Sequence, residues 1–215
     1  MSEILIPGPE GRIEAIYKDH SKNPSNCTAL ILHNDPSKGG TMHNKVVYNL
    51  YKCFTKNNFS TLRFNFRGAG KSDGKFDGGE GELADAAAVL DWLHNQNPNF
   101  EICWVAGFSF GSWIAMQLLM RRPEINGFIC VAPPTDTRDF NFLSPCPSSG
   151  LIVHGDKDEI SSYDTSKILS EKLQKQKKIN ISFQTIKGAD HFFINHYEKL
   201  QQIINNYLED NVKET

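Results

Sequence analysis

The sequence lacks a strong excess of charge of either sign. Its 215 residues include 23 basic and 25 acidic side chains, which leave a formal net charge of −2 at pH 7. Because such a balance creates no field that would gather nucleic acid or an anionic membrane, we expect neither as a partner. No stretch approaches the roughly 18 uncharged apolar residues of a membrane-spanning helix, and residues 1–19 contain no signal peptide. We therefore expect a soluble protein with one domain over residues 1–215.

Paired cysteines are also absent. The five cysteines are odd in number, lie far apart and form no Cys-x-x-Cys pair: Cys27, Cys53, Cys103, Cys130 and Cys146. This scatter argues against a disulfide framework and against a zinc site. We expect free thiols in a reducing compartment, which favours the cytoplasm.

A third absence concerns the stretch FNFRGAGKSDGKFDGG, residues 64–79, which contains Gly70, Lys71 and Ser72. A phosphate-binding loop needs another glycine at position 65, where this chain has Asn65. The residues that follow form a glycine-broken polar coil, which cannot begin the helix whose amides would hold a phosphate. The glycine spacing of a dinucleotide-binding fingerprint is missing as well. We therefore expect no nucleotide site here.

What the sequence does contain is an alternation of short β-branched and aromatic runs with longer segments of helical period. Strands are expected at residues 27–32, 59–66, 101–106, 126–132, 150–154 and 179–186. Helices are expected at residues 44–56, 80–95, 112–122, 163–178 and 197–210. Residues 3–6 and 12–17 suit an antiparallel edge hairpin, and residues 133–147 form a proline-rich coil. The pattern predicts an α/β fold with a mostly parallel sheet and helices on both faces.

The strongest chemical motif follows the strand expected at residues 101–106. Gly107-Phe108-Ser109-Phe110-Gly111 leads directly into a helix, which is G-x-S-x-G in a strand-turn-helix context. The glycines fit a sharp turn that presents Ser109 at the carboxyl edge of the sheet, beside a helix N-terminus that favours developing negative charge. A serine between glycines can also simply cap a helix. The residues available to act with Ser109 decide between these interpretations.

Two later segments offer such residues. A serine hydroxyl needs a histidine to take its proton, and that histidine needs a carboxylate to orient it. HGDKDEI, residues 154–160, and KGADHFF, residues 187–193, each lie at the end of a predicted strand. They therefore lie at the edge where open α/β sheets place their sites. The carboxylates in these segments are Asp156, Asp158 and Asp190, and Asp136 after the preceding strand is a further candidate.

Together these motifs resemble those of the α/β-hydrolases, and more narrowly those of small lidless bacterial hydrolases related to dienelactone hydrolase and to serine aminopeptidases. The similar segments span almost the whole chain: HNDPSKGGTMHNKVV, LRFNFRGAGKSDGKFDGGEGELADAAAVLDWL, VAGFSFGS, VAPP, LIVHGDKDEI and GADHFF. The resemblance implies an α/β-hydrolase fold without a lid domain. In that family an Arg-Gly-x-Gly-x-Ser segment shapes the wall of the site, and residues 67–72 match it.

Carried over position by position, the resemblance implies a catalytic triad in which Ser109 is the nucleophile, His191 the base and Asp158 the acid. The family's Gly-x-x-Asp pattern selects Asp158 over Asp156, whereas Asp136 occupies an acid position that some hydrolases use. The other six histidines are expected to be structural or to lie on the surface: His20, His33, His43, His94, His154 and His196.

The loop that begins at His33 corresponds to one half of the family's oxyanion hole. The expected donors are the backbone amides of Asp35 and Phe110. Relatives often carry His-Pro where this chain has Asp35-Pro36, so the resemblance places an unusual carboxylate at the rim of the hole. The proline and valine usual after the acid are replaced as well, because Ile160 is followed by two serines. These departures concern substrate choice and efficiency rather than the fold.

The implied activity is hydrolysis of small carboxylic esters through an acyl-enzyme on Ser109, with no metal or organic cofactor. Hydrolysis of small aminoacyl peptides or amides is one alternative. A non-catalytic binding protein on the same fold is another, motivated by Asp35. The coil at residues 133–147 is too short for a lid, so we expect an open site, a small-molecule substrate, and a monomer or homodimer.

Overall fold

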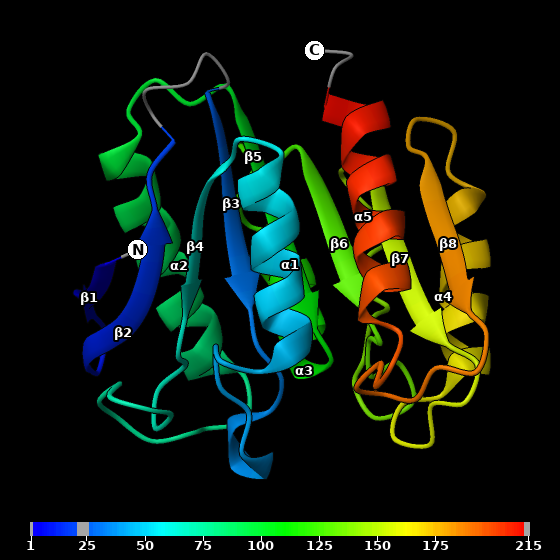
Figure 1. The fold of residues 1–215 in the computed structure, drawn as a ribbon, viewed down its shortest axis with the longest axis horizontal. Coiled ribbons are helices and arrows are strands. Elements are labelled where there is room, and N and C mark those ends of the chain that lie inside the picture. Colours follow the sequence, from blue (N-terminus) through cyan, green and yellow to red (C-terminus); the bar gives the residue numbers. More distant parts are fainter. Residues whose placement is uncertain (1, 21–25, 213–215) are drawn as a thin grey trace.

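The computed structural model describes residues 2–20 and 26–212, and its described strands form a single sheet (Figure 1). The strand order is β1-β2-β4-β3-β5-β6-β7-β8. The bounds are β1 Ser2–Gly8, β2 Gly11–Lys18, β3 Cys27–Leu32, β4 Ser60–Phe64, β5 Ile102–Phe108, β6 Gly127–Val131, β7 Gly150–Gly155 and β8 Ile181–Ile186. β2 pairs antiparallel with both β1 and β4, and the other described neighbours run parallel. The predicted mostly parallel sheet and edge hairpin are confirmed.

Helices cover both faces of this sheet (Figure 1). On one face lie α1 (Lys45–Lys56) and α5 (Tyr197–Val212), which contact each other. On the opposite face lie α2 (Glu80–Gln96), α3 (Phe110–Leu119) and α4 (Tyr163–Gln174). Because central strands are covered on both sides, their residues are mostly apolar, and every residue of β3 is buried.

Each face of the sheet has its own apolar core. The core beneath α2, α3 and α4 includes Leu90 and Ile114, and the core beneath α1 and α5 includes Leu50 and Ile204. Burial of this apolar surface is the dominant favourable contribution to folding. With both faces covered by helices, the carboxyl edge of the sheet remains as the place where loops from several strands meet.

The helix predicted at residues 112–122 begins and ends earlier in the structure. α3 begins at Phe110, because the chain enters the helix directly after the turn at Ser109. It ends at Leu119, and Met120 serves as the C-cap. Because α3 begins at Phe110, the backbone amide that directly follows Ser109 is the first amide of the helix.

The helix predicted to reach Lys178 ends at Gln174 instead. Beyond it, the side chain of Gln176 accepts a hydrogen bond from the N–H of Cys146 and donates one to the carbonyl oxygen of Leu143. These bonds satisfy backbone groups of the coil after β6, which helical continuation would leave without those partners. Tertiary contacts thus override a local helical pattern.

The glycine-rich stretch at residues 64–79 has its own internal contacts. The backbone N–H and the guanidinium of Arg67 all donate to the carboxylate of Asp85 on α2. The Nζ of Lys71 lies 3.0 Å from a carboxylate oxygen of Glu3. Since the next helix begins only at Glu80, Lys71 does not open a helix as the lysine of a phosphate-binding loop does.

Residues 133–147 contain neither helix nor strand, so no lid domain is built into this coil. Within residues 2–20 and 26–212, no helix has both the length and the apolar character needed to cross a membrane. The predicted lidless α/β architecture is confirmed.

Candidate active site

Ser109 stands at a sharp turn between β5 and α3. Its φ of 52° and ψ of −120° lie in a region that residues with side chains rarely adopt. Packing accounts for both flanking glycines, because a Cβ on Gly107 would lie 2.3 Å from the carbonyl of Gly111, and a Cβ on Gly111 would lie 2.4 Å from the carbonyl oxygen of Leu32. The Ser109 N–H donates to the carbonyl oxygen of Val131 at 2.9 Å. These contacts fix Ser109 at the carboxyl edge of the sheet.

His191 comes from the loop after β8 and meets Ser109 at this edge. Its Nε2 lies 3.1 Å from Oγ of Ser109, which is hydrogen-bond distance for a nucleophile and its base. The histidine is only 4% exposed. Its ring packs against Phe108 and Phe192, with centroid separations of 5.0 and 5.2 Å. The aromatic contacts favour the ring orientation in which Nε2 faces the hydroxyl.

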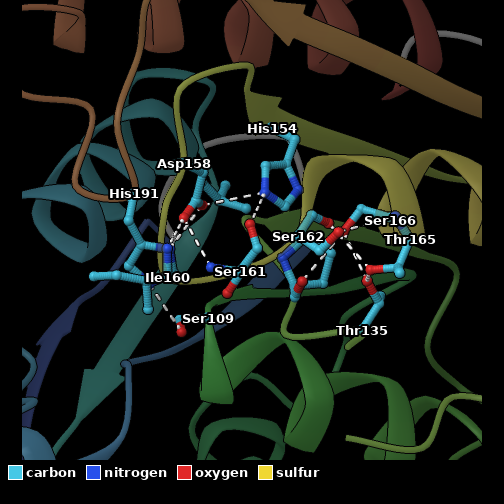
Figure 2. A network of polar contacts seen from close by, with 12 residues as sticks. Ser109, Thr135, His154, Asp158, Ile160, Ser161, Ser162, Thr165, Ser166 and His191 are labelled. Atoms are coloured by element: carbon cyan, nitrogen blue, oxygen red, sulfur yellow. Dashed lines mark hydrogen bonds and ion pairs between the residues drawn. The ribbon is translucent and has the colours of Figure 1, made fainter. Parts of the chain in front are cut away.

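Asp158 extends this contact into a hydrogen-bonded series, because its Oδ2 lies 2.8 Å from Nδ1 of His191 (Figure 2). A carboxylate acceptor selects the Nδ1–H tautomer, so Nε2 is free to accept a proton. The other oxygen, Oδ1, accepts the backbone N–H groups of Ile160 and Ser161, each at 2.8 Å. Burial alone would raise the pKa of the carboxyl group, but hydrogen bonds from His154, His191 and the Ser161 amide hold it well below its ordinary value.

The other candidate carboxylates make different contacts. Oδ1 of Asp156 accepts the N–H of Gly188 at 2.5 Å, and Oδ1 of Asp190 accepts the N–H of Ile194 at 2.9 Å. Asp136 is exposed and lines a groove beside α4. The structure therefore brings Asp158, and none of these three, into hydrogen-bond contact with the histidine within the described residues.

The two backbone amides expected to form an oxyanion hole belong to Phe110, at the start of α3, and to Asp35, in the loop after β3. Phe110 is the first residue of α3, so its N–H has no carbonyl of a preceding helical turn to bond. The loop of Asp35 begins at His33, which is fully buried. Nδ1 of His33 lies 2.6 Å from the carbonyl oxygen of Asn34, and Nε2 accepts the N–H of Phe66 at 3.0 Å. Burial lowers the pKa of His33 to about 4, so the ring supports this loop in its neutral form.

The Asp35 carboxylate is occupied by a local contact. Its Oδ1 accepts the N–H and the hydroxyl of Ser37, at 2.8 and 2.6 Å, and so caps the short 3₁₀ helix Pro36–Lys38. These bonds are exposed to solvent. Water therefore screens the charge that the sequence places next to the expected amide donor.

One contact of the site is absent from the sequence expectations. His154, expected to be structural or on the surface, is fully buried, and its Nε2 lies 3.1 Å from Oδ2 of Asp158. The available signal is local: His154 is the penultimate residue of β7, only four residues before Asp158, and a tight turn brings the two together. The sequence places His154 near the end of a predicted strand, but it does not give the path of the turn that follows.

A groove of about 490 Å³ lies between the coil after β6 and α4. Its polar walls include Thr135, Asp136 and Arg138, and its apolar walls include Ile168 and Leu169. Across residues 2–20 and 26–212, no three His, Cys, Asp or Glu side chains are grouped so that they could hold a metal ion.

Several known proteins are similar to this chain. Residues 36–148 match the family model described as serine aminopeptidase, S33. An uncharacterized protein of Rickettsia prowazekii is 50% identical over 97% of this chain and 89% of its own length. A crystal structure from Agrobacterium tumefaciens, a protein of unknown function provisionally assigned to the alpha/beta hydrolases, is 48% identical with a TM-score of 0.94 and covers 99% of this chain and 97% of that chain.

A third similar protein, from Xanthomonas campestris, is described as a member of the a/b serine hydrolases without a lid. It is 28% identical, covers 97% of this chain and 94% of its own, and superposes with a TM-score of 0.85. These matches confirm the resemblance seen in the sequence motifs. The chain belongs to the α/β-hydrolase superfamily and is similar to its lidless serine hydrolases.

Proposed function

We propose that the protein is a serine hydrolase that cleaves small carboxylic esters through an acyl-enzyme on Ser109. One observation carries the proposal: a hydrogen-bonded series runs from Oγ of Ser109 through both ring nitrogens of His191 to Oδ2 of Asp158. A series of this kind supplies a nucleophile, a base and an orienting carboxylate. Membership of the hydrolase superfamily supports the same class of chemistry.

In the proposed reaction, Nε2 of His191 takes the hydroxyl proton while Oγ of Ser109 attacks the ester carbonyl carbon. The backbone N–H groups of Phe110 and Asp35 bind the oxyanion that develops. The C–O bond to the alcohol then breaks, and the imidazolium gives its proton to the departing oxygen. Water attacks the acyl-enzyme with the same base, which releases a carboxylic acid and restores Ser109. Asp158 stabilises the imidazolium without taking its proton.

The open architecture favours small substrates. The coil at residues 133–147 forms no lid, so no further domain built from it closes over the edge where Ser109 lies. The proposal places this site in one domain over residues 1–215, acting as a monomer or homodimer in the cytoplasm. A single sheet that contains every described strand supports one domain. Five buried free thiols support a reducing compartment such as the cytoplasm.

Hydrolysis of small aminoacyl peptides or amides is a second candidate, favoured by an exposed carboxylate. Asp136 lines the groove and no ion pair to it is present among the described residues. A free α-ammonium group is a suitable partner for such a carboxylate. Under this candidate, Asp136→Asn raises KM for aminoacyl amides more than for uncharged esters.

A fluorophosphonate probe tests the proposal most cheaply, because it reacts with an activated serine. We expect stoichiometric labelling of the wild type and of Ser182→Ala, which alters a serine on β8, but none of Ser109→Ala. A screen of p-nitrophenyl esters against aminoacyl amides then ranks the two substrate classes. A folded wild type that stays unlabelled and cleaves neither class would instead favour a non-catalytic binding protein.

A further inference from the structure

A second histidine, His154, contacts the carboxylate of Asp158 from the side opposite His191 (Figure 2). Its Nε2 lies 3.1 Å from Oδ2 of Asp158 and 3.2 Å from the carbonyl oxygen of Ser161. Since both neighbours are acceptors, Nε2 carries the ring proton. This N–H is hydrogen-bonded to the Ser161 carbonyl oxygen, and Oδ2 of Asp158 lies close enough to share it. The side chains of His154 and Asp158 have no exposed surface, so water does not compete for this bond.

This donor completes the hydrogen bonding of Asp158. Oδ1 accepts the backbone N–H groups of Ile160 and Ser161, whereas Oδ2 accepts Nδ1–H of His191 and lies 3.1 Å from Nε2 of His154. An ionised carboxylate has about four acceptor sites, and three of them accept hydrogen bonds here while His154 faces the fourth. A rotation that turned Oδ2 away from His191 would therefore also break the bond to His154.

The surroundings of His154 argue against a role in stability alone. Its ring packs edge-on against Tyr163, with centroids 6.0 Å apart and planes at 88°. Its Nδ1 is buried and has no hydrogen-bond partner among residues 2–20 and 26–212. A buried nitrogen without a partner is destabilising, and an apolar side chain at this position would avoid that penalty. The interaction made by the opposite nitrogen is the feature that an apolar side chain would lose.

We infer that His154 is a positioning residue for the proposed hydrolase, because its Nε2–H holds Oδ2 of Asp158 toward Nδ1 of His191. The inference rests on the function proposed for Ser109. The same bond draws negative charge away from the oxygen that faces His191, and so moderates how strongly Asp158 stabilises the imidazolium. His154 thus sets both the direction and the strength of the Asp158 contact.

Other ionisable groups around this contact have different partners. The Tyr163 hydroxyl is hydrogen-bonded to the hydroxyl of Thr185. Asp156 and Asp190 accept backbone N–H groups of the loop after β8. Lys157 and Glu159 are exposed. A change in the titration of His191 on substitution of His154 therefore reports on the Asp158 bond.

Two substitutions separate the donor from the volume of the ring. His154→Phe keeps an aromatic ring without a donor, and His154→Gln keeps a donor at a similar reach. For His154→Phe we expect kcat to fall about tenfold, because a lost hydrogen bond to a buried charge is worth a factor of that order. KM should stay unchanged, since His154 is fully buried away from substrate. The acid limb of kcat/KM should move up by roughly half a pH unit or more, because Oδ2 then carries more charge.

His154→Gln should restore both kcat and the pH limb toward wild type. If it behaves like His154→Phe, the packing of the imidazole and not its donor is responsible, and the inference is wrong. Unchanged kcat and an unchanged acid limb in His154→Phe would overturn it as well.

A measurement on the wild type needs neither activity nor a folded variant. Two-bond ¹H–¹⁵N spectra of the histidine rings should show His154 as the Nε2–H tautomer at neutral pH. An Nδ1–H tautomer would overturn the inference whether or not any ester is cleaved. The opposite combination, an Nε2–H tautomer in a protein that no fluorophosphonate labels, would contradict the proposed function but not the contact of His154 with Asp158.

Discussion

Two buried carboxylates of this protein have the same chemistry and nearly the same burial, but they have different partners. Asp85 on α2 is 1% exposed and accepts the backbone N–H, Nε and Nη2 of Arg67 at 3.0, 3.0 and 2.8 Å. Asp158 has no exposed side-chain surface, accepts two backbone amides and Nδ1–H of His191, and lies 3.1 Å from Nε2 of His154. Each carboxylate is thus well bonded, and burial does not distinguish them.

The difference lies in whether the partner can change its proton. The bond to Asp85 raises the pKa of Arg67 above its already high ordinary value, so the pair keeps its charges and only ties the glycine-rich stretch to α2. Histidine exchanges its ring proton near neutral pH, so the partner of Asp158 can take and return one. The partner, and not the buried acid, separates a structural carboxylate from a proposed catalytic one.

The largest expected effect comes from removing the proposed nucleophile, Ser109, or its base, His191. Ser109→Ala and His191→Ala should each lower kcat for ester hydrolysis by about 10⁶-fold, and the double variant should be no worse than either single one, because such residues act as a unit. Thermal unfolding should be nearly unchanged, as measured by circular dichroism. Residual activity above roughly a tenth of wild type in Ser109→Ala would contradict its assignment as nucleophile.

Neutralising the acid itself should come next. Asp158→Asn should lower kcat by about 10⁴-fold, because an amide favours the wrong tautomer of the histidine. Asp136→Asn is the matched control and should change kcat for neutral esters by less than about twofold, since an exposed side chain that touches neither reacting group contributes little. Steady-state kinetics on one p-nitrophenyl ester distinguishes them. A damaging Asp136→Asn with a mild Asp158→Asn would move the acid to the end of β6.

Substitution of Asp85, the structural carboxylate, should lower stability and leave activity nearly unchanged. Asp85→Asn leaves the buried guanidinium of Arg67 without its main counter-ion, and should lower the free energy of unfolding by about 3 kcal/mol. The activity per folded molecule should stay within about twofold of wild type, because Asp85 contacts no residue of the Ser109 series. Urea unfolding and active-site labelling measure the two quantities. Normal stability combined with lost activity would erase the distinction between the two carboxylates.

A third buried group, His33, extends the comparison to pH. Its pKa is lowered by burial to about 4 in the folded state, against about 6.5 in the unfolded chain, so the unfolded state binds more protons between these values. The contribution of His33 to stability should therefore be complete above pH 6.5 and should fall as the pH drops toward 4, by up to roughly 3 kcal/mol.

Urea titrations of wild type and His33→Gln between pH 4 and pH 7 isolate this contribution. The stability of the glutamine variant should fall less than that of the wild type as the pH drops, because the variant has no proton to gain. Other groups, such as Glu82 with its pKa raised to about 7, contribute equally to both curves and cancel in the difference. Asp158, whose pKa is depressed, loses stability only as the pH falls through and below the ordinary range of a carboxyl group, so it does not obscure the result. Identical slopes would show that His33 does not titrate in this way.

The smallest effect is expected at Asp35, a half-buried residue whose carboxylate bonds to Ser37 are exposed to solvent. Two charges about 5 Å apart repel by less than about 1 kcal/mol when water separates them, and the Asp35 carboxylate is bonded to Ser37 at a solvent-exposed position. Asp35→Asn keeps both the backbone donor and a capping side chain. It should raise kcat/KM for anionic esters over neutral ones by less than about fivefold, and high salt should narrow the gap. Equal effects on both classes at low salt would leave Asp35 without an electrostatic role.

Much of the fold was readable from local patterns. Cys27–Leu32 is an apolar run bounded by polar residues, and the strand has the predicted bounds. The G-x-S-x-G motif located the turn because steric demands at Gly107 and Gly111 act within five residues. The predicted Ser109, His191 and Asp158 lie together because three parallel strands end at the same edge.

What the sequence did not reveal depends on contacts between distant segments. The early end of α4 follows from Gln176 bonding to the coil after β6, a contact that no local pattern contains. The contact of His154 with Asp158 depends on the exact path of the turn between them, and the capping of the 3₁₀ helix by Asp35 depends on loop geometry. Contacts of this kind between single residues become visible only in the three-dimensional structure. The ends of strands, in contrast, can be predicted from the periodicity of the sequence.

The central claim is that Ser109 forms an acyl-enzyme, and rapid mixing with p-nitrophenyl acetate followed by mass spectrometry tests it most directly. We expect a burst of one equivalent of p-nitrophenol and one acetyl group on the peptide that contains Ser109, with the acetyl-enzyme persisting longer in Asp158→Asn and forming normally in Asp85→Asn. Turnover without an acetyl group on Ser109, or acetylation of another residue that survives in Ser109→Ala, would contradict the account.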